Sequence, residues 1–139
     1  MRKPRTESER RQFFAEKYGR APSATAQQLE RSILGHELGL NGYTTVRQAA
    51  ALSATLEGGP EARLLDIGSA YGWPGCYVAR SLGCHVVLTD IPQDALRRAE
   101  SNARVQGLAE HAHVSAADAR QLPFRSHSFD AVVHADVLC

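Results

Sequence analysis

The chain has 139 residues, the length of one domain that can bury a core. Its formal net charge of +1 favours neither a nucleic acid nor a membrane surface as a partner. No apolar run approaches the roughly 20 residues of a spanning helix. The three cysteines form no Cys-x-x-Cys pair, and the basic residues 1–11 lack the apolar stretch of a signal peptide. These features predict a reduced, cytoplasmic protein.

Residues 1–60 are predicted to form a tail and a helical cap. Residues 1–5 form a basic tail, and Thr6 with Glu9 makes a capping box that opens a helix ending at Gly19. Glutamates interleave with the cations, which favours a solvated surface over a nucleic-acid-binding arm. The cations concerned are Arg2, Lys3, Arg5, Arg10 and Arg11.

Two further helices and a loop complete this cap. A helix is predicted over residues 23–35, and another begins at Thr45, whose capping-box partner is Gln48. Tyr43 precedes that last helix, on a loop that contains two glycines. Loops carry function disproportionately, so two roles stay open for Tyr43. It closes over a ligand at the sheet, or it packs the loop onto the domain.

Residues 61–139 are predicted to form an incomplete Rossmann-like domain of the α/β class. Strands that alternate with helices give a parallel sheet with right-handed crossovers and helices on both faces. The fourth strand would lie at one side of the sheet and leave an edge open to self-association. The four predicted strands cover residues 64–67, 85–89, 111–115 and 129–134.

The stretch from Leu64 to Gly75 carries the strongest functional signal. A buried strand is followed by a turn with Gly68 and Gly72, where the backbone bends tightly and a ligand can approach closely. Pro74 then suits the first position of a helix. A strand, a small-residue turn and a helix together aim free backbone N–H groups at a negatively charged ligand group.

Two ligands fit this stretch. Ala70-x-Gly72-x-x-Gly75 is close to the GxGxxG dinucleotide motif, and Asp90 lies 18 residues after Gly72 (90 − 72), near the spacing of a ribose-binding acid. Asp66 at the strand end argues against a dinucleotide, because its carboxylate would lie near a pyrophosphate. The Asp66 carboxylate would instead favour S-adenosylmethionine, which carries an ammonium and a sulfonium beside a carboxylate.

Acidic residues follow three successive strands. Asp66, Asp90 and Asp118 each come at or just past a strand end, so they are expected along the carboxyl edge where such sheets bind ligands. Ordinary alternatives stay open for two of them. Asp90 would cap the helix that follows Pro92, and Asp118 would be a turn residue.

These motifs together resemble the class I S-adenosylmethionine-dependent methyltransferases. The run Asp66-x-Gly68-x-Ala70-x-Gly72 is similar to the family's DxGxGxG motif. The segment 117–119 resembles the family's adenine-contacting segment. Residues 122–133 resemble the run into the fourth strand of the UbiE-like, methyltransferase type 11 branch, which acts on small molecules.

The resemblance implies a cofactor site but no particular catalytic residue. Asp90 would hold the ribose hydroxyls, Asp118 would accept from the adenine amine, and His134 falls where the family contacts the methionine end. No metal site is predicted, because His111 and His113 lack further ligands. The implied cofactor-binding residues are Tyr43, Asp66, Gly68, Ser69, Ala70, Gly72, Asp90, Ile91, Ala117, Asp118, Ala119 and His134.

The sequence therefore predicts a methyltransferase for a small-molecule acceptor, with S-adenosylmethionine as cofactor. Two departures from the family stand against full activity. Ala70 replaces the middle glycine of the motif, where its methyl group would crowd the ligand, and the sequence stops at Cys139, shortly after the fourth strand. The alternatives are an NAD(P)-binding oxidoreductase and a non-catalytic cofactor-binding fragment.

Overall fold

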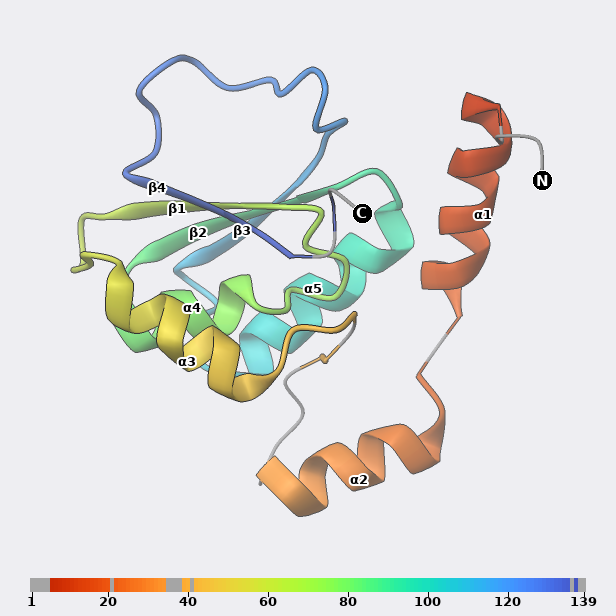
Figure 1. Ribbon diagram of the computed structural model, residues 1–139, viewed down its shortest axis with the longest axis horizontal. Coiled ribbons are helices and arrows are strands. Elements are labelled where there is room, and N and C mark those ends of the chain that lie inside the picture. Colours follow the sequence, from red (N-terminus) through yellow and green to blue (C-terminus); the bar gives the residue numbers. More distant parts are fainter. Residues whose placement is uncertain (1–5, 21, 35–38, 41, 136, 138–139) are drawn as a thin grey trace.

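In the computed structural model, four parallel strands form one sheet in the order β3-β2-β1-β4. The structure describes residues 6–20, 22–34, 39–40, 42–135 and 137. The predicted tail over residues 1–5, the predicted helix end at Gly35 and the chain end at Cys139 lie outside these residues. Figure 1 shows helices packed along the sheet and an N-terminal arm of two helices beside it.

The strand order confirms the predicted Rossmann-like fold. The strands are β1 (Arg63–Ile67), β2 (His85–Asp90), β3 (Ala112–Ala116) and β4 (Ala131–His134). Leu65 in β1 pairs with Val87 on one side and with Val132 on the other. Strand order reverses between β1 and β4, and sheets of this kind bind ligands at the carboxyl edge beside such a reversal.

Strand β4 begins at Ala131 rather than at the predicted Phe129. Asp130 lies just before the strand, and its amide donates to the carbonyl of Arg63 at 2.9 Å. Its side chain in turn accepts from the Arg63 amide at 2.8 Å. These two bonds align the start of β4 with the start of β1, so Asp130 supports the strand.

Three helices lie on one side of the sheet (Figure 1). They are α3 (Val46–Thr55), α4 (Gly75–Leu82) and α5 (Gln93–Val105). Thr45 and Gln48 form the predicted capping box at the start of α3. The core lies between these helices and the sheet. Its strand residues include Leu64, Val86, Leu88 and Val133, and its helix residues include Val78, Ala79, Ala99 and Ala103.

The other side of the sheet is crossed by a loop. Residues 117–130 connect β3 to β4 over this side without a helix (Figure 1), so the described residues place helices on one face where the sequence predicts both. The consequence is clearest in β4. Val133 faces the core and is 3% exposed, whereas Val132 faces the other side and is 54% exposed. Strand β4 is thus buried on one face only.

The N-terminal helices are α1 (Glu7–Gly19) and α2 (Ala24–Leu34). Thr6 and Glu9 form the predicted capping box of α1, and the Ser23 hydroxyl accepts from the amide of Ala26 at the start of α2. Helix α1 buries none of its residues, although it contacts α5. Its position therefore depends on polar and ring contacts at the surface.

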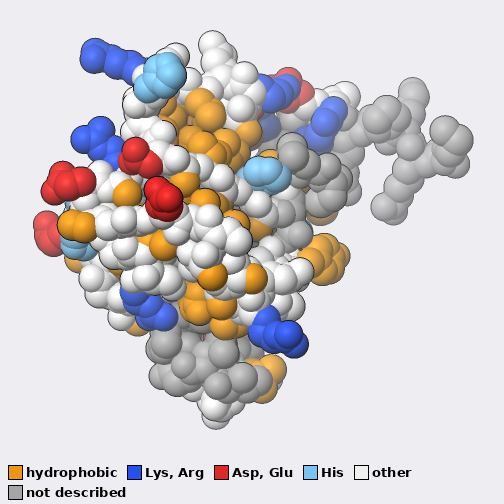
Figure 2. Space-filling model, turned by 60° about the vertical axis from the view of Figure 1, so that its left-hand side comes forward, with side chains coloured by type: hydrophobic (Ala, Val, Ile, Leu, Met, Phe, Trp, Pro, Cys, Tyr) orange, Lys and Arg blue, Asp and Glu red, His pale blue; other side chains and the backbone are white. Residues whose placement is uncertain are grey.

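The surface mixes side chains of different kinds. Figure 2 shows acidic, basic and hydrophobic side chains interspersed over one face of the molecule, in line with a formal net charge of +1. Across the described part of the chain, no helix is both long enough and apolar enough to cross a membrane.

Candidate functional site

The turn after β1 is fixed by the end of β2. The amides of Gly68 and Ser69 both donate to the carbonyl of Thr89, at 2.8 and 2.9 Å. The Thr89 hydroxyl donates to the carbonyl of Asp66 at 2.9 Å. Gly68 has a φ of 71°, a left-handed conformation that glycine adopts without steric cost. The predicted small-residue turn therefore exists and lies at the carboxyl edge of the sheet.

Asp66 lies beneath this turn, buried between β1 and α4. Its side chain is fully buried, and its Oδ2 accepts from the amide of Gly75 at 3.0 Å. Gly75 is the first residue of α4, and Pro74 is the N-cap rather than the first helical residue as predicted. Asp66 thus occupies the helix N-terminus that the sequence argument assigned to a ligand carboxylate. A methyl group on Gly75 would lie 2.3 Å from this oxygen.

Burial also changes the charge of Asp66. Removal from water raises the pKa of Asp66 to about 8, against an opposing hydrogen bond from Gly75, so the group is largely protonated at neutral pH. Only an ionised carboxylate at this position would disfavour the pyrophosphate of a dinucleotide. Asp66 therefore does not discriminate between the two ligands, which have to be distinguished by other observations.

Ala70 carries a cost that the sequence does not reveal. Its φ is 44°, a conformation that costs an L-residue about 1–2 kcal/mol. The residue is 1% exposed and does not line the cavity described below. Its methyl group therefore points into the protein. The prediction that this methyl group crowds a ligand is wrong. Its amide donates to Oδ2 of Asp90 at 2.9 Å.

Asp90 links the turn to the end of β2. Besides the Ala70 amide, its carboxylate accepts from the amide of Ile91 at 2.7 Å, through Oδ1. Helix α5 has Pro92 as its N-cap and no side-chain cap, so Asp90 does not cap it. Partial burial raises the pKa of Asp90, while the two amide hydrogen bonds lower it. Each oxygen keeps a lone pair for a ligand hydroxyl.

A cavity of about 460 Å³ opens at the carboxyl edge, beside Asp90. Its inner wall comes from the strand ends and the segments that follow them, with Tyr43 on a loop at the rim, 86% exposed. The indole of Trp73 donates to the carbonyl of Thr44 at 2.9 Å and so fixes that loop. The inner wall consists of Ile67, Gly68, Asp90, Ile91, Pro92, Ala117, Asp118, Ala119, Ala135 and Val137.

The predicted site residues divide into two groups. Seven of them line the cavity: Tyr43, Gly68, Asp90, Ile91, Ala117, Asp118 and Ala119. The others do not, because Asp66, Ser69, Ala70 and Gly72 lie behind or beneath the turn, and His134 is an exposed residue at the end of β4. The second group shapes the turn or the strand end, and only the first can touch a ligand in the cavity.

Sequence reasoning missed the outer wall of this cavity, which α1 provides. The six residues concerned recur at helical spacing on one face, and they are Glu7, Arg10, Arg11, Phe14, Lys17 and Tyr18. This spacing was the available signal. Arg10 and Arg11 are exposed, as predicted for a solvated surface, and both also line the cavity.

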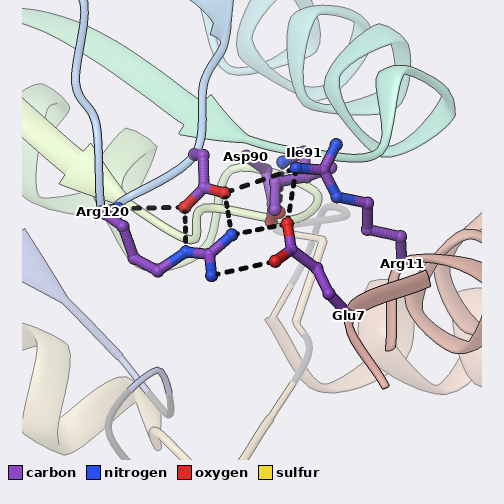
Figure 3. A network of polar contacts seen from close by, with 6 residues as sticks. Glu7, Arg11, Asp90, Ile91 and Arg120 are labelled. Atoms are coloured by element: carbon purple, nitrogen blue, oxygen red, sulfur yellow. Dashed lines mark hydrogen bonds and ion pairs between the residues drawn. The ribbon is translucent and has the colours of Figure 1, made fainter. Parts of the chain in front are cut away.

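Arg120 was also missed, and it sits at the centre of a charged network at the cavity mouth (Figure 3). Its guanidinium donates to Asp118 at 2.6 and 3.0 Å and to Glu7 on α1 at 2.9 Å. Arg11 lies 3.0 Å from Glu7 and 3.6 Å from Asp118. The hydrogen bonds from Arg120 hold the pKa of both carboxyls below its usual range. Asp118 is therefore a turn residue in an ion-pair network and also part of the cavity wall.

The histidines gather elsewhere. The ring of His85 lies 4.8 Å from that of His111 and 6.4 Å from that of His113, centroid to centroid. Over the described ranges of the chain, no set of three His, Cys, Asp or Glu side chains is arranged to hold a metal ion.

The arrangement defines a Rossmann-like α/β protein with a ligand site at the carboxyl edge of its sheet. Residues 64–139 match the model of a family described as a methyltransferase domain. Because this match covers more than half of the chain, the chain belongs to that family.

Two individual relatives match part of the chain. The chain is 34% identical over 76 residues to an uncharacterized protein of Haemophilus influenzae, covering 55% of this chain and 30% of that protein. It is 30% identical over 90 residues to the glycine/sarcosine/dimethylglycine N-methyltransferase of Actinopolyspora halophila, covering 65% and 16%. The chain thus spans less than a third of either relative.

Solved structures share the fold. A methyltransferase from Thiobacillus denitrificans, determined in complex with S-adenosyl-L-homocysteine, superposes with a TM-score of 0.62 at 22% identity. The superposition covers 84% of this chain and 45% of that one. At this identity the likeness concerns the fold alone.

Proposed function

We propose that this chain forms the cofactor-binding part of an S-adenosylmethionine-dependent methyltransferase that acts on a small molecule. One observation carries the proposal. Two acidic side chains line the same cavity at the carboxyl edge of the sheet, Asp90 at the end of β2 and Asp118 just past β3. The family assignment supplies the reaction class.

The residues present fit a nucleoside with an amino-acid tail. The Asp90 oxygens would accept from the ribose hydroxyls and Asp118 from the adenine amine. Ala117 and Ala119 leave room beside Asp118 because their side chains are small. Gly68 at the turn makes room for Val137, because a methyl group there would lie 2.4 Å from a side-chain carbon of that residue.

The chemistry expected of this chain is mainly positioning. When bound, S-adenosylmethionine supplies a methyl group activated by its attachment to a sulfonium. The residues of this chain hold the reactants, and fixing two reactants in line lowers the barrier without a dedicated catalytic group. Tyr43, which lines the cavity and is exposed, would cover the reacting end and exclude water. We assign no general base.

A small acceptor is favoured by the names of two relatives. One acts on glycine, sarcosine and dimethylglycine, and a structural neighbour is a geranyl diphosphate methyltransferase, with a TM-score of 0.69 at 18% identity.

A nicotinamide-dependent oxidoreductase is the second candidate. The Ala70 to Gly75 spacing favours it, and the protonated Asp66 would tolerate a pyrophosphate. Calorimetric titration of the chain with S-adenosyl-L-homocysteine and, separately, with NAD distinguishes the two candidates. We expect binding of the first only. Binding of NAD without any response to S-adenosyl-L-homocysteine would contradict the proposal.

The same titration tests Asp90. Asp90→Ala is expected to cost about 1.5–3 kcal/mol of binding free energy, the range for hydrogen bonds to a charged group. Asp94→Ala serves as the control, because Asp94 is an exposed acid four residues along that does not line the cavity. Circular dichroism checks the fold of both variants. If folded Asp90→Ala binds as tightly as Asp94→Ala, Asp90 only supports the turn.

A further inference from the structure

Helix α1 forms the outer wall of the cavity without being part of the core. Its cavity-lining residues lie along one face, from Glu7 at the first turn to Tyr18 at the last. None of its residues is buried. A wall held only by surface contacts can move away as a unit if the contacts at one end are weaker than those at the other.

The C-terminal end of α1 is firmly held. The hydroxyl of Tyr71 lies 3.1 Å from the carbonyl of Tyr18 and 3.2 Å from that of Arg20. Arg98 donates to the carbonyl of Gly19 at 3.0 Å and also to that of Arg20. The Tyr71 ring is 8% exposed and meets the Tyr18 ring edge-on at 5.8 Å. These contacts satisfy the last carbonyls of the helix, which have no partner within it.

The N-terminal end is held by a network of exposed ion pairs. Glu7 and Arg11 contact Arg120 and Asp118 across the cavity mouth (Figure 3). The side chains of Glu7, Arg11 and Arg120 are 54–66% exposed. Exposed ion pairs are weak and are screened by salt. The two ends of α1 therefore differ in kind, since one is a partly buried anchor and the other is an exposed electrostatic contact.

We propose that Arg120 is a positioning residue that orients Asp118 toward the cofactor and, through Glu7, latches α1 closed over it. The helix would hinge at Tyr71 and Arg98, and its N-terminal end would swing away to admit or release the ligand. The proposal rests on the proposed function, because it takes the ligand of the cavity to be S-adenosylmethionine or its product.

Asp118 couples the Glu7–Arg120 contact to the ligand, because Arg120 and the ligand amine would both use the Asp118 carboxylate. A carboxylate offers about four acceptor positions. Arg120 occupies three of them, through its amide and two side-chain nitrogens. A ligand amine would take the remaining position, the one that Arg11 approaches at 3.6 Å. Ligand binding and closure of α1 are thus linked, and the linkage is reciprocal.

The test compares two substitutions that remove the same charge from α1. Glu7→Gln breaks the contact with Arg120. Glu16→Gln is the matched control, because Glu16 contacts Gln12 on the same helix and does not line the cavity. Two quantities are measured on the full chain. They are the dissociation rate of labelled S-adenosyl-L-homocysteine, and the rate of tryptic cleavage after Arg10, Arg11 and Lys17, with and without ligand.

We expect Glu7→Gln to raise both rates about threefold, the effect of losing exposed ion pairs, while Glu16→Gln matches the unsubstituted chain. Raising NaCl to about 1 M should bring the unsubstituted chain to the Glu7→Gln rate, because charges are then screened within about 3 Å. A purely structural role for Glu7 would not give this salt response.

The two possible failures can be told apart. Equal dissociation and cleavage rates for Glu7→Gln and Glu16→Gln overturn the latch. A chain that does not bind S-adenosyl-L-homocysteine overturns the proposed function instead. In that case cleavage of the ligand-free variants still decides whether Glu7 holds α1.

Discussion

The turn between β1 and α4 and the helix α1 border the same cavity, but they are held in opposite ways. The turn rests on the fully buried Asp66 and on Trp73, which is 2% exposed. Helix α1 buries nothing and is tied down at its N-terminus by exposed ion pairs. The inner wall of the site is thus set by packing, and the outer wall by electrostatics.

This difference separates two kinds of sensitivity. Packing in a core tolerates almost no added volume, because interiors are as dense as organic crystals. Exposed ion pairs tolerate substitution at little cost but respond to salt and to ligands. Substitutions in the turn should therefore change the stability of the domain, and substitutions in α1 should change ligand exchange.

The largest effect is expected from the titration of Asp66. Its folded pKa of about 8 lies above the unfolded value, so the folded chain binds the extra proton and the stability due to this group falls as pH rises from about 4 to 8. Asp66→Asn does not titrate. Relative to that variant, the unfolding free energy of the chain should fall by about 2–3 kcal/mol between pH 5 and pH 7, as measured by urea denaturation.

Asp118 shows the opposite direction, which sharpens the comparison. Its pKa is lowered by Arg120, so the contribution of its ion pairs is present above the usual carboxyl pKa and is lost as pH falls.

For Asp66, a difference in unfolding free energy between the unsubstituted chain and Asp66→Asn that stays constant with pH would contradict the assignment of a protonated, buried side chain.

The second prediction compares the same substitution, glycine to alanine, at one position in each region. In Gly75→Ala the new methyl group would lie 2.3 Å from the buried Oδ2 of Asp66, so we expect a loss of about 1–3 kcal/mol from overpacking. In Gly19→Ala, at the end of α1, the nearest atom is 3.9 Å away, and alanine favours the helix. Thermal unfolding measures both variants. Equal losses would show that the two regions are not packed differently.

The smallest effect is expected at Ala70. Glycine removes the strain of a φ of 44°, worth about 1–2 kcal/mol, but it adds flexibility to the unfolded chain and removes a buried methyl group. Ala70→Gly should therefore change stability by less than about 0.5 kcal/mol. Ala51→Gly, at an exposed position of α3, lacks the compensating relief and should cost about 1 kcal/mol. The prediction is wrong if denaturant unfolding gives equal losses for the two variants.

The sequence alone determined the elements of the fold, because their signals are local. The capping boxes at Thr6 and Thr45, the run from Leu64 to Ile67 and the glycine turn each lie within a few residues of chain. The order of strands and helices then fixed a parallel sheet. Asp90 and Asp118 could be placed at its carboxyl edge from that order, and both line the cavity.

Only the tertiary structure decided how these elements meet. Glu7 contacts Arg120 across 113 residues of sequence, and Tyr71 contacts Tyr18 across 53. The helical spacing in α1 therefore shows which residues share a face, but not that this face forms a wall of the cavity. The burial of Asp66 depends on Gly75, whose missing side chain admits the carboxyl. The left-handed turn at Ala70 and the bond from its amide to Asp90 likewise follow from β1 and β2 lying side by side. Charge, strain and exposure depend on neighbours brought from elsewhere in the chain, which is why the motif located the site while the fold determined what each residue does there.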